Sequence, residues 1–153
     1  MNINGAQIHL LINHAPVIGF PLVLLTYLWG KFKREVQVEI YAFYLTIVIW
    51  VTTAISFLTG DLAEEKLESL PHFAKELIST HDNTAENAFI IASIVAVMAI
   101  LSLPYVQKYL PRLKEDKVRS ALQFAFCTAL MAVCILLAIV AHQGGLIRHT
   151  ELR

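Results

Sequence analysis

The sequence is poor in charge and in cysteine, and several motifs of catalytic chemistry are missing from it. Only 16% of the 153 residues are charged, and only two are cysteines. There is no Gly-rich phosphate loop, no Cys-x-x-Cys-His segment and no Gly-x-Ser-x-Gly elbow. Nucleotide chemistry, covalent haem attachment and serine hydrolysis therefore lack support, and nucleic-acid binding is not expected. Cys127 and Cys134 lie seven residues apart in one apolar run, too far along a helix to form a disulfide.

No Lys or Arg precedes the first apolar run, so we expect this run to stay in the mature chain rather than act as a cleaved signal peptide.

Apolar residues make up 57% of the sequence and the mean hydropathy is +0.61, as is typical of a membrane protein. Four runs are long enough to cross a hydrocarbon core about 30 Å thick: residues 8–29, 40–58, 88–106 and 121–141. The sequence therefore predicts an all-α fold, a four-transmembrane-helix bundle that forms one integral membrane domain over residues 1–153.

The basic residues predict how this bundle is oriented. Eight of the twelve Lys and Arg residues fall in the two short loops, namely Lys31, Lys33, Arg34, Lys108, Arg112, Lys114, Lys117 and Arg119. Short basic loops stay in the cytoplasm, so we expect both termini and the 59–87 loop outside a bacterial inner membrane. Aromatic residues typical of an interfacial belt cluster near the predicted cytoplasmic ends: Tyr27, Trp29, Tyr41, Tyr44, Tyr105 and Tyr109. Apolar residues recur at helical spacing over 61–80, which predicts a short amphipathic interfacial segment divided at Pro71.

All six histidines fall on the predicted outer side. They are His9, His14, His72, His81, His142 and His149. His14 and His142 lie at or inside the boundaries of the first and fourth spans, where an ionisable side chain is costly unless it is paired. We therefore regard these two as the leading candidates for ligands of a bound group, with His81 and His9 in reserve.

The leading hypothesis is a membrane redox subunit that binds haem b near the outer face and transfers electrons. Two imidazoles on facing helices are the ligands that six-coordinate haem iron needs. His14 and His142 would supply them, and Arg148 is placed to pair with a haem propionate. The expected partners are the lipid bilayer and a membrane or periplasmic redox protein or quinone.

Two alternatives stay open. The first is a non-haem centre containing iron, copper, zinc or manganese, which acts as a metalloenzyme or in metal handling. Its candidate ligands are His14, His142, His81, His149, Glu86, Asp61 and Glu64. The second is a structural or assembly subunit of a larger membrane complex or of a homo-oligomer. The sequence does not decide whether the chain is an enzyme.

Some of these residues also have a purely structural interpretation. Asn83 and Glu86 fit a capping box that opens the third span. Gly144 and Gly145 fit a left-handed cap at the end of the fourth. Alanines at helical spacing favour a close helix contact rather than a slot for haem; they are Ala85, Ala88, Ala92, Ala96 and Ala99.

Four short stretches resemble the marker motifs of a family of small, uncharacterised bacterial membrane proteins with four helices. They are residues 9–19, 59–64, 81–82 and 144–151, and the last is the most specific. Where the family has Glu-Pro after Thr-Gly, this chain has Asp61 and Leu62, and it has Asp82 where the family has Glu. The resemblance covers the whole chain and implies a four-helix bundle with a polar outer cluster, but it supplies no activity.

Overall fold

The computed structural model describes residues 5–68 and 75–148, and every regular element in those two ranges is helical. In chain order the elements are α1 (Gly5–Ile12), α2 (His14–Lys33), α3 (Val36–Leu58), α4 (Gly60–Glu68), α5 (Lys75–Ser102), α6 (Pro104–Tyr109), the 3-10 turn η1 (Pro111–Lys114) and α7 (Asp116–Arg148). Four segments are long and apolar enough to cross a membrane: Gln7–Lys33, Val36–Leu58, Lys75–Ser102 and Asp116–Ile147. The predicted all-α fold with four spans is confirmed, and the chain is a multi-pass membrane protein.

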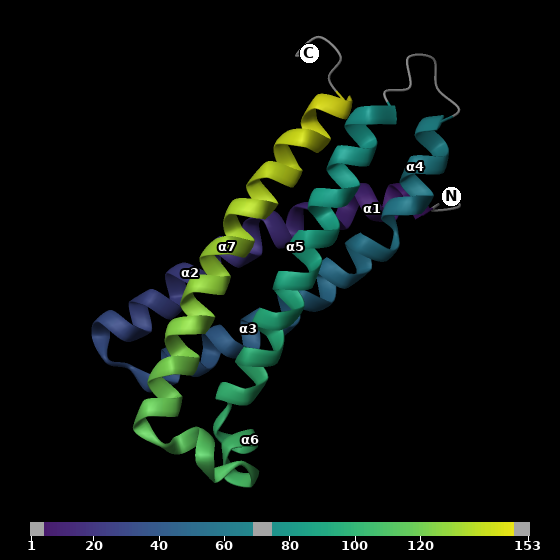
Figure 1. The fold of residues 1–153 in the computed structure, drawn as a ribbon. Coiled ribbons are helices and arrows are strands. Elements are labelled where there is room, and N and C mark those ends of the chain that lie inside the picture. Colours follow the sequence, from purple (N-terminus) through teal and green to yellow (C-terminus); the bar gives the residue numbers. More distant parts are fainter. Residues whose placement is uncertain (1–4, 69–74, 149–153) are drawn as a thin grey trace.

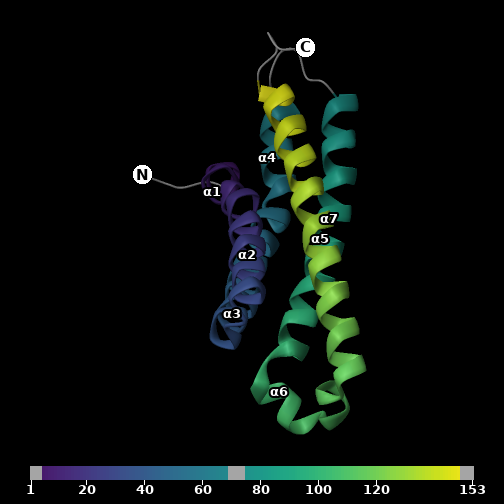
Figure 2. The same ribbon diagram turned by 90° about the vertical axis from the view of Figure 1, so that its left-hand side faces the viewer.

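The helices pack in two layers (Figure 2), with α1, α2 and α3 in one layer and α5 and α7 in the other. Helices α5 and α7 lie side by side over most of their length (Figure 1). Because α2 contacts α7 and α3 contacts α5, the four long helices form an up-and-down bundle. We call the end with α1, α4, the start of α5 and the end of α7 the histidine end. The opposite end, with the α2 to α3 turn, α6 and η1, is the basic end.

The turn between α2 and α3 is held by a left-handed residue and an ion pair. Arg34 has φ 57°, and the N–H of Glu35 donates to the carbonyl of Gly30 over 2.9 Å. Lys31 Nζ lies 2.7 Å from a carboxylate oxygen of Glu39, which is 8% exposed. A Cβ on Gly30 would lie 3.0 Å from the backbone nitrogen of Glu39, so glycine at this position lets the two helices approach closely.

An aromatic cluster and a row of small residues form the core. The Phe126 ring is fully buried, with centroids 5.0 Å from Tyr27 and 5.2 Å from Phe43 in edge-to-face contacts. On α5 the alanines at 88, 92, 96 and 99 are at most 3% exposed, which confirms the predicted close helix contact for these four positions, whereas Ala85 is half-buried. Tyr27 is 2% exposed, so its predicted place in the interfacial belt was wrong and it belongs to the core.

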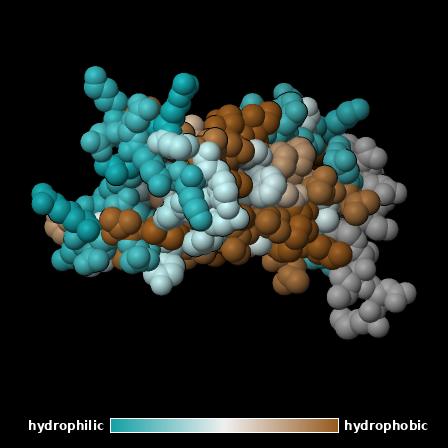
Figure 3. All heavy atoms as spheres, turned by 90° about the horizontal axis from the view of Figure 1, so that it is seen from below, coloured by the Kyte–Doolittle hydropathy of each residue, from teal (hydrophilic) through white to brown (hydrophobic). Residues whose placement is uncertain are grey.

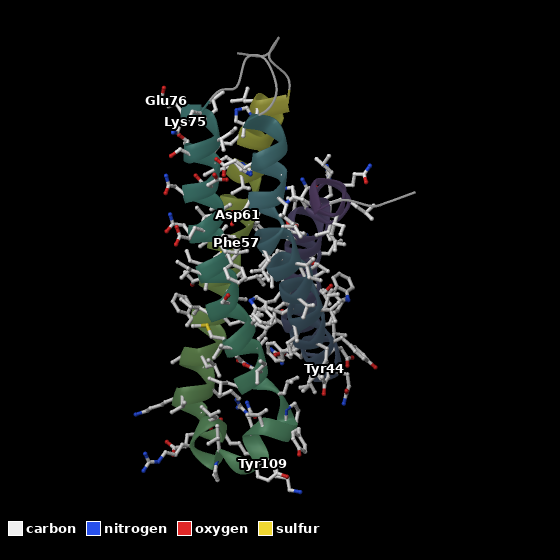
Figure 4. The ribbon with its side chains drawn as sticks, turned by 90° about the vertical axis from the view of Figure 1, so that its right-hand side faces the viewer. Tyr44, Phe57, Asp61, Lys75, Glu76 and Tyr109 are labelled. Atoms are coloured by element: carbon white, nitrogen blue, oxygen red, sulfur yellow. The ribbon has the colours of Figure 1, made fainter. Side chains whose placement is uncertain are left out.

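The surface of the bundle matches a membrane environment. Seen from below, hydrophobic residues cover the middle and right of the molecule, and hydrophilic residues gather mainly on the left with a smaller group at the upper right (Figure 3). Tyr44 and Tyr109 lie toward the basic end, whereas Lys75 and Glu76 lie at the histidine end (Figure 4). The other members of the predicted aromatic belt, Trp29, Tyr41 and Tyr105, are exposed like Tyr44 and Tyr109. Exposed large apolar and aromatic side chains on a helical bundle are expected where lipid replaces water as the neighbour.

Three local predictions differ from the structure. The capping box is wrong because α5 already begins at Lys75, and Asn83 lies inside the helix with Nδ2 donating to the Ser79 carbonyl over 2.8 Å. The glycine cap is wrong because α7 continues to Arg148 without a positive φ at either glycine. The predicted interfacial segment is divided: α4 packs on α1, residues 75–80 belong to α5, and Pro71 lies outside the described residues.

Replacing Gly19 with Ala is expected to destabilise the bundle by about 1–3 kcal/mol, because the added methyl group would overpack the contact between α2 and α3. A Cβ at this position would lie 2.5 Å from Cδ1 of Ile49 and 2.8 Å from its Cγ1. Gly145→Ala is the matched control, since no atom lies within 4 Å of a Cβ built there. Thermal unfolding in detergent measures both, and equal midpoints for the two variants would contradict the expected overpacking.

Candidate functional site at the histidine end

The described histidines lie on four different elements of the histidine end. His9 is on α1, His14 opens α2, His81 lies in the first part of α5, and His142 lies near the end of α7. His72 and His149 lie outside the described residues. This arrangement follows from the bundle topology, since the first crossing begins and the fourth crossing ends on the same side.

Burial separates these histidines into two pairs. His9 and His81 are half-buried, whereas His14 and His142 are exposed. The two positions that the sequence placed first as haem ligands therefore lie on the outside of the bundle, and the two reserve positions lie between helices. The charges of His9 and His81 are close enough to interact with each other.

A backbone carbonyl of a neighbouring helix holds the His9 ring. Its Nδ1 lies 2.9 Å from the carbonyl oxygen of Ser56 near the end of α3. Because a carbonyl only accepts, Nδ1 carries a proton and donates, and in a neutral ring Nε2 is then the nitrogen that has the lone pair. Ligand histidines are commonly oriented in this way, through a hydrogen bond from the nitrogen that does not bind the metal.

The His81 ring is held in a comparable way between α5 and α7. The backbone of Val140 hydrogen-bonds to the ring, and Nδ1 is buried without a partner among the described residues. The ring packs against Gly144, where an added Cβ would lie 3.4 Å from Cε1 and 3.8 Å from Nδ1. Glycine at this position keeps open the side of the ring on which Nδ1 lies.

Two other buried polar atoms at this end also lack partners among the described residues. They are Oδ1 of Asn13, at the junction of α1 and α2, and Oε1 of Gln143 on α7. A buried polar atom without a hydrogen bond costs about 1–3 kcal/mol, so three such atoms at one end of a small bundle need an explanation. Water or another polar group from outside the chain would supply the missing hydrogen bonds.

Carboxylates lie beside the half-buried imidazoles. Asp82 on α5 is close enough to Asp61 and His9 for their charges to interact. Asp61 lies between Phe57 and the start of α5 along the long axis of the bundle (Figure 4). Pairwise interactions therefore link ionisable groups on three helices: His9 with His81 and with Asp82, and Asp82 with Asp61.

The remaining predicted site residues are placed as follows. Glu64 is half-buried on α4 and has an interaction partner, whereas Glu86 is exposed on α5. Helix α7 ends at Arg148, whose side chain lies outside the described part of the structure. Within residues 5–68 and 75–148, no three His, Cys, Asp or Glu side chains are grouped so that they could hold a metal ion.

Sequence reasoning missed Gln143 and the backbone carbonyls of Ser56 and Val140. The signal for Gln143 was present, because an amide beside His142 interrupts the end of an otherwise apolar run. The two carbonyls had no signal in the sequence, since any residue type supplies the same acceptor.

Comparison with protein-family models, with curated proteins and with solved structures gave no match to this chain. The assignment of a site therefore rests on the geometry of the histidine end alone.

Proposed function

We propose that this protein is a membrane redox subunit that binds haem b at the histidine end, where His9 and His81 would hold the haem iron. The observation that supports it most directly is that both rings are half-buried between helices, with His9 Nδ1 donating to the Ser56 carbonyl and with a buried His81 Nδ1 that has no hydrogen-bond partner among the described residues. Two imidazoles from different helices suit a low-spin haem, and the hydrogen bond from His9 to the Ser56 carbonyl would fix the tautomer of that ring. His14 and His142, being exposed, are less suited to enclosing a cofactor.

The neighbouring residues fit this group. Gly144 leaves space against His81, and the Phe57 and Phe89 rings, stacked at a centroid distance of 4.6 Å, provide flat apolar surface where α3 meets α5. Arg148 at the end of α7 is the candidate partner for a propionate. When bound, haem b would supply one-electron transfer, while the chain orients the ligands and limits water access.

The proposed setting is a bacterial inner membrane with both termini outside, following the positive-inside rule for the basic loops. Electrons would then pass between the histidine end and a quinone or an extracytoplasmic redox partner. Attachment of an alkaline phosphatase reporter to the carboxyl terminus tests the orientation, since the enzyme becomes active only when it is exported.

A non-haem metal centre is the second candidate, and the observation that favours it is that Asp82 lies close enough to both Asp61 and His9 for their charges to interact. Carboxylate and imidazole ligands together suit iron, manganese, zinc or copper. The same half-buried histidines would serve, so the two candidates differ in cofactor rather than in position.

An absorption spectrum of the detergent-purified protein from cells given ample haem distinguishes the two candidates. We expect a Soret band that shifts on reduction by dithionite, together with about one iron per chain by elemental analysis. A stoichiometric metal without porphyrin absorbance would replace haem with the non-haem centre. Protein that holds neither haem nor metal would reject both candidates and favour an assembly role.

A further inference from the structure

The basic end carries a segment that the proposed redox function does not use. This segment, which we call the basic elbow, comprises α6, η1 and the first turn of α7, residues 104–119. It connects the two longest helices at the end of the bundle opposite α4 (Figures 1 and 2). Its five basic side chains are all exposed: Lys108, Arg112, Lys114, Lys117 and Arg119.

Most of this positive charge is not neutralised within the chain. Arg119 pairs with Asp116 over 2.7 Å, and Glu115 is the only other acid in the segment. The four remaining basic side chains make no ion pair with residues 5–68 or 75–148. A cluster of exposed, unpaired cations on one short segment creates a local positive potential that attracts anions.

The elbow also carries residues that suit the membrane interface. Tyr105 and Tyr109 are 68% and 63% exposed, and their rings meet edge to face at 5.4 Å. Leu110 is 45% exposed. Tyrosine is enriched at the level of the lipid headgroups, because its apolar ring contacts lipid there while its hydroxyl group contacts water. The elbow lies between the ends of two candidate spans, at Ser102 and Asp116, which places it at that level.

We propose that the basic elbow is a binding site for the headgroups of anionic phospholipids. A phosphate group offers oxygen acceptors for Lys and Arg, and the acyl chains of the same lipid would continue along the apolar sides of α5 and α7. An acidic protein would satisfy the charge but would leave Tyr105, Tyr109 and Leu110 without an apolar neighbour. A lipid satisfies both features of the surface.

The test compares two double variants of equal charge change in nanodiscs of phosphatidylglycerol or phosphatidylcholine. Arg112→Gln with Lys114→Gln removes two charges from the elbow, whereas Lys33→Gln with Arg34→Gln removes two from the other turn at the same end. Native mass spectrometry measures how many phosphatidylglycerol molecules each variant retains relative to phosphatidylcholine. Each elbow charge is worth about fivefold in relative affinity, so the elbow variant should lose about 25-fold and the control much less.

Equal losses in the two variants would overturn the assignment to the elbow, and a wild-type chain without preference for phosphatidylglycerol would overturn lipid binding altogether. Inorganic phosphate is the probe that distinguishes a free phosphate ion from a lipid headgroup, since the elbow could bind the phosphate group of either one. If millimolar phosphate displaces phosphatidylglycerol completely, the elbow is a phosphate site rather than a lipid site. Circular dichroism of both variants checks that the helices are intact. The measured lipid preference does not depend on whether haem is bound.

Discussion

Replacing His81 with Ala is expected to weaken haem binding by more than about 100-fold, so that the purified variant shows almost no Soret absorbance. Removing a residue that hydrogen-bonds to a metal ligand typically lowers the affinity for the metal about 10- to 100-fold. Removing the ligand itself lowers this affinity further. The substitution removes the buried Nδ1, which has no protein partner among the described residues, and leaves a gap beside Gly144. His9→Ala should have the same effect, because it removes Nε2, the nitrogen that does not take part in the hydrogen bond to Ser56. Titration of the apoprotein with hemin, followed at the Soret band, measures both affinities.

The exposed histidines supply the matched controls. His14→Ala and His142→Ala remove the same side chain at the same end of the bundle, but from surfaces that face outward. Both variants should keep hemin affinity within about threefold of the wild type, since surface substitutions away from a site usually change free energies by less than about 0.5 kcal/mol. If these two lose haem while His81→Ala and His9→Ala keep it, the ligands are the pair that the sequence ranked first.

The fold was predictable because the requirement of the bilayer is simple. Each span needs about 20 apolar residues, and composition alone reveals such runs. The spacing of the alanines on α5 indicated a close contact between helices, and their burial agrees with it. The ends of the helices were harder to predict. Helix α5 extends well beyond its apolar run, from Lys75, because polar residues outside the hydrocarbon core can continue a helix without a hydropathy signal.

The choice between histidines could not be made from the sequence, for a geometric reason. Distance along the chain gives the depth of a residue in the membrane but not the direction in which its side chain points. An ideal helix turns about 100° per residue, so positions five apart, such as His9 and His14, point about 140° away from each other. On one helix these two side chains would point in different directions, and the break between α1 and α2 at Asn13 changes the angle between them further.

Gly144 was assigned the wrong structural role, because the sequence does not show which side chain of another helix packs against it. Two adjacent glycines near the end of an apolar run favour a left-handed cap, since glycine adopts that conformation readily. In the structure α7 passes through both glycines, and the His81 ring of α5 rests against Gly144. Gly144 therefore makes room for the His81 ring and does not adopt a left-handed backbone conformation. Only tertiary packing reveals this role.

Phe126→Ala is expected to lower the free energy of unfolding by about 3–5 kcal/mol, because truncation of a buried Phe leaves a cavity that its neighbours cannot fill. The Phe126 side chain is fully buried and meets both Tyr27 of α2 and Phe43 of α3 edge to face, so one substitution loosens three helices at once. Loss of packing matters especially in a membrane, where lipid tails are as apolar as the core and contact between helices is the main source of cohesion.

Phe124→Ala is the matched control, because Phe124 lies two residues earlier on α7 and is 76% exposed. Its truncation only exchanges contacts with lipid, so the expected change is within about 0.5 kcal/mol. Unfolding in mixed micelles with increasing fractions of sodium dodecyl sulfate, followed by circular dichroism, measures both variants. If the two substitutions cost the same, Phe126 does not pack between α2 and α3 as described. Because the aromatic cluster lies among residues that do not belong to the histidine end, Phe126→Ala protein that still folds should keep its hemin affinity, which separates stability from cofactor binding.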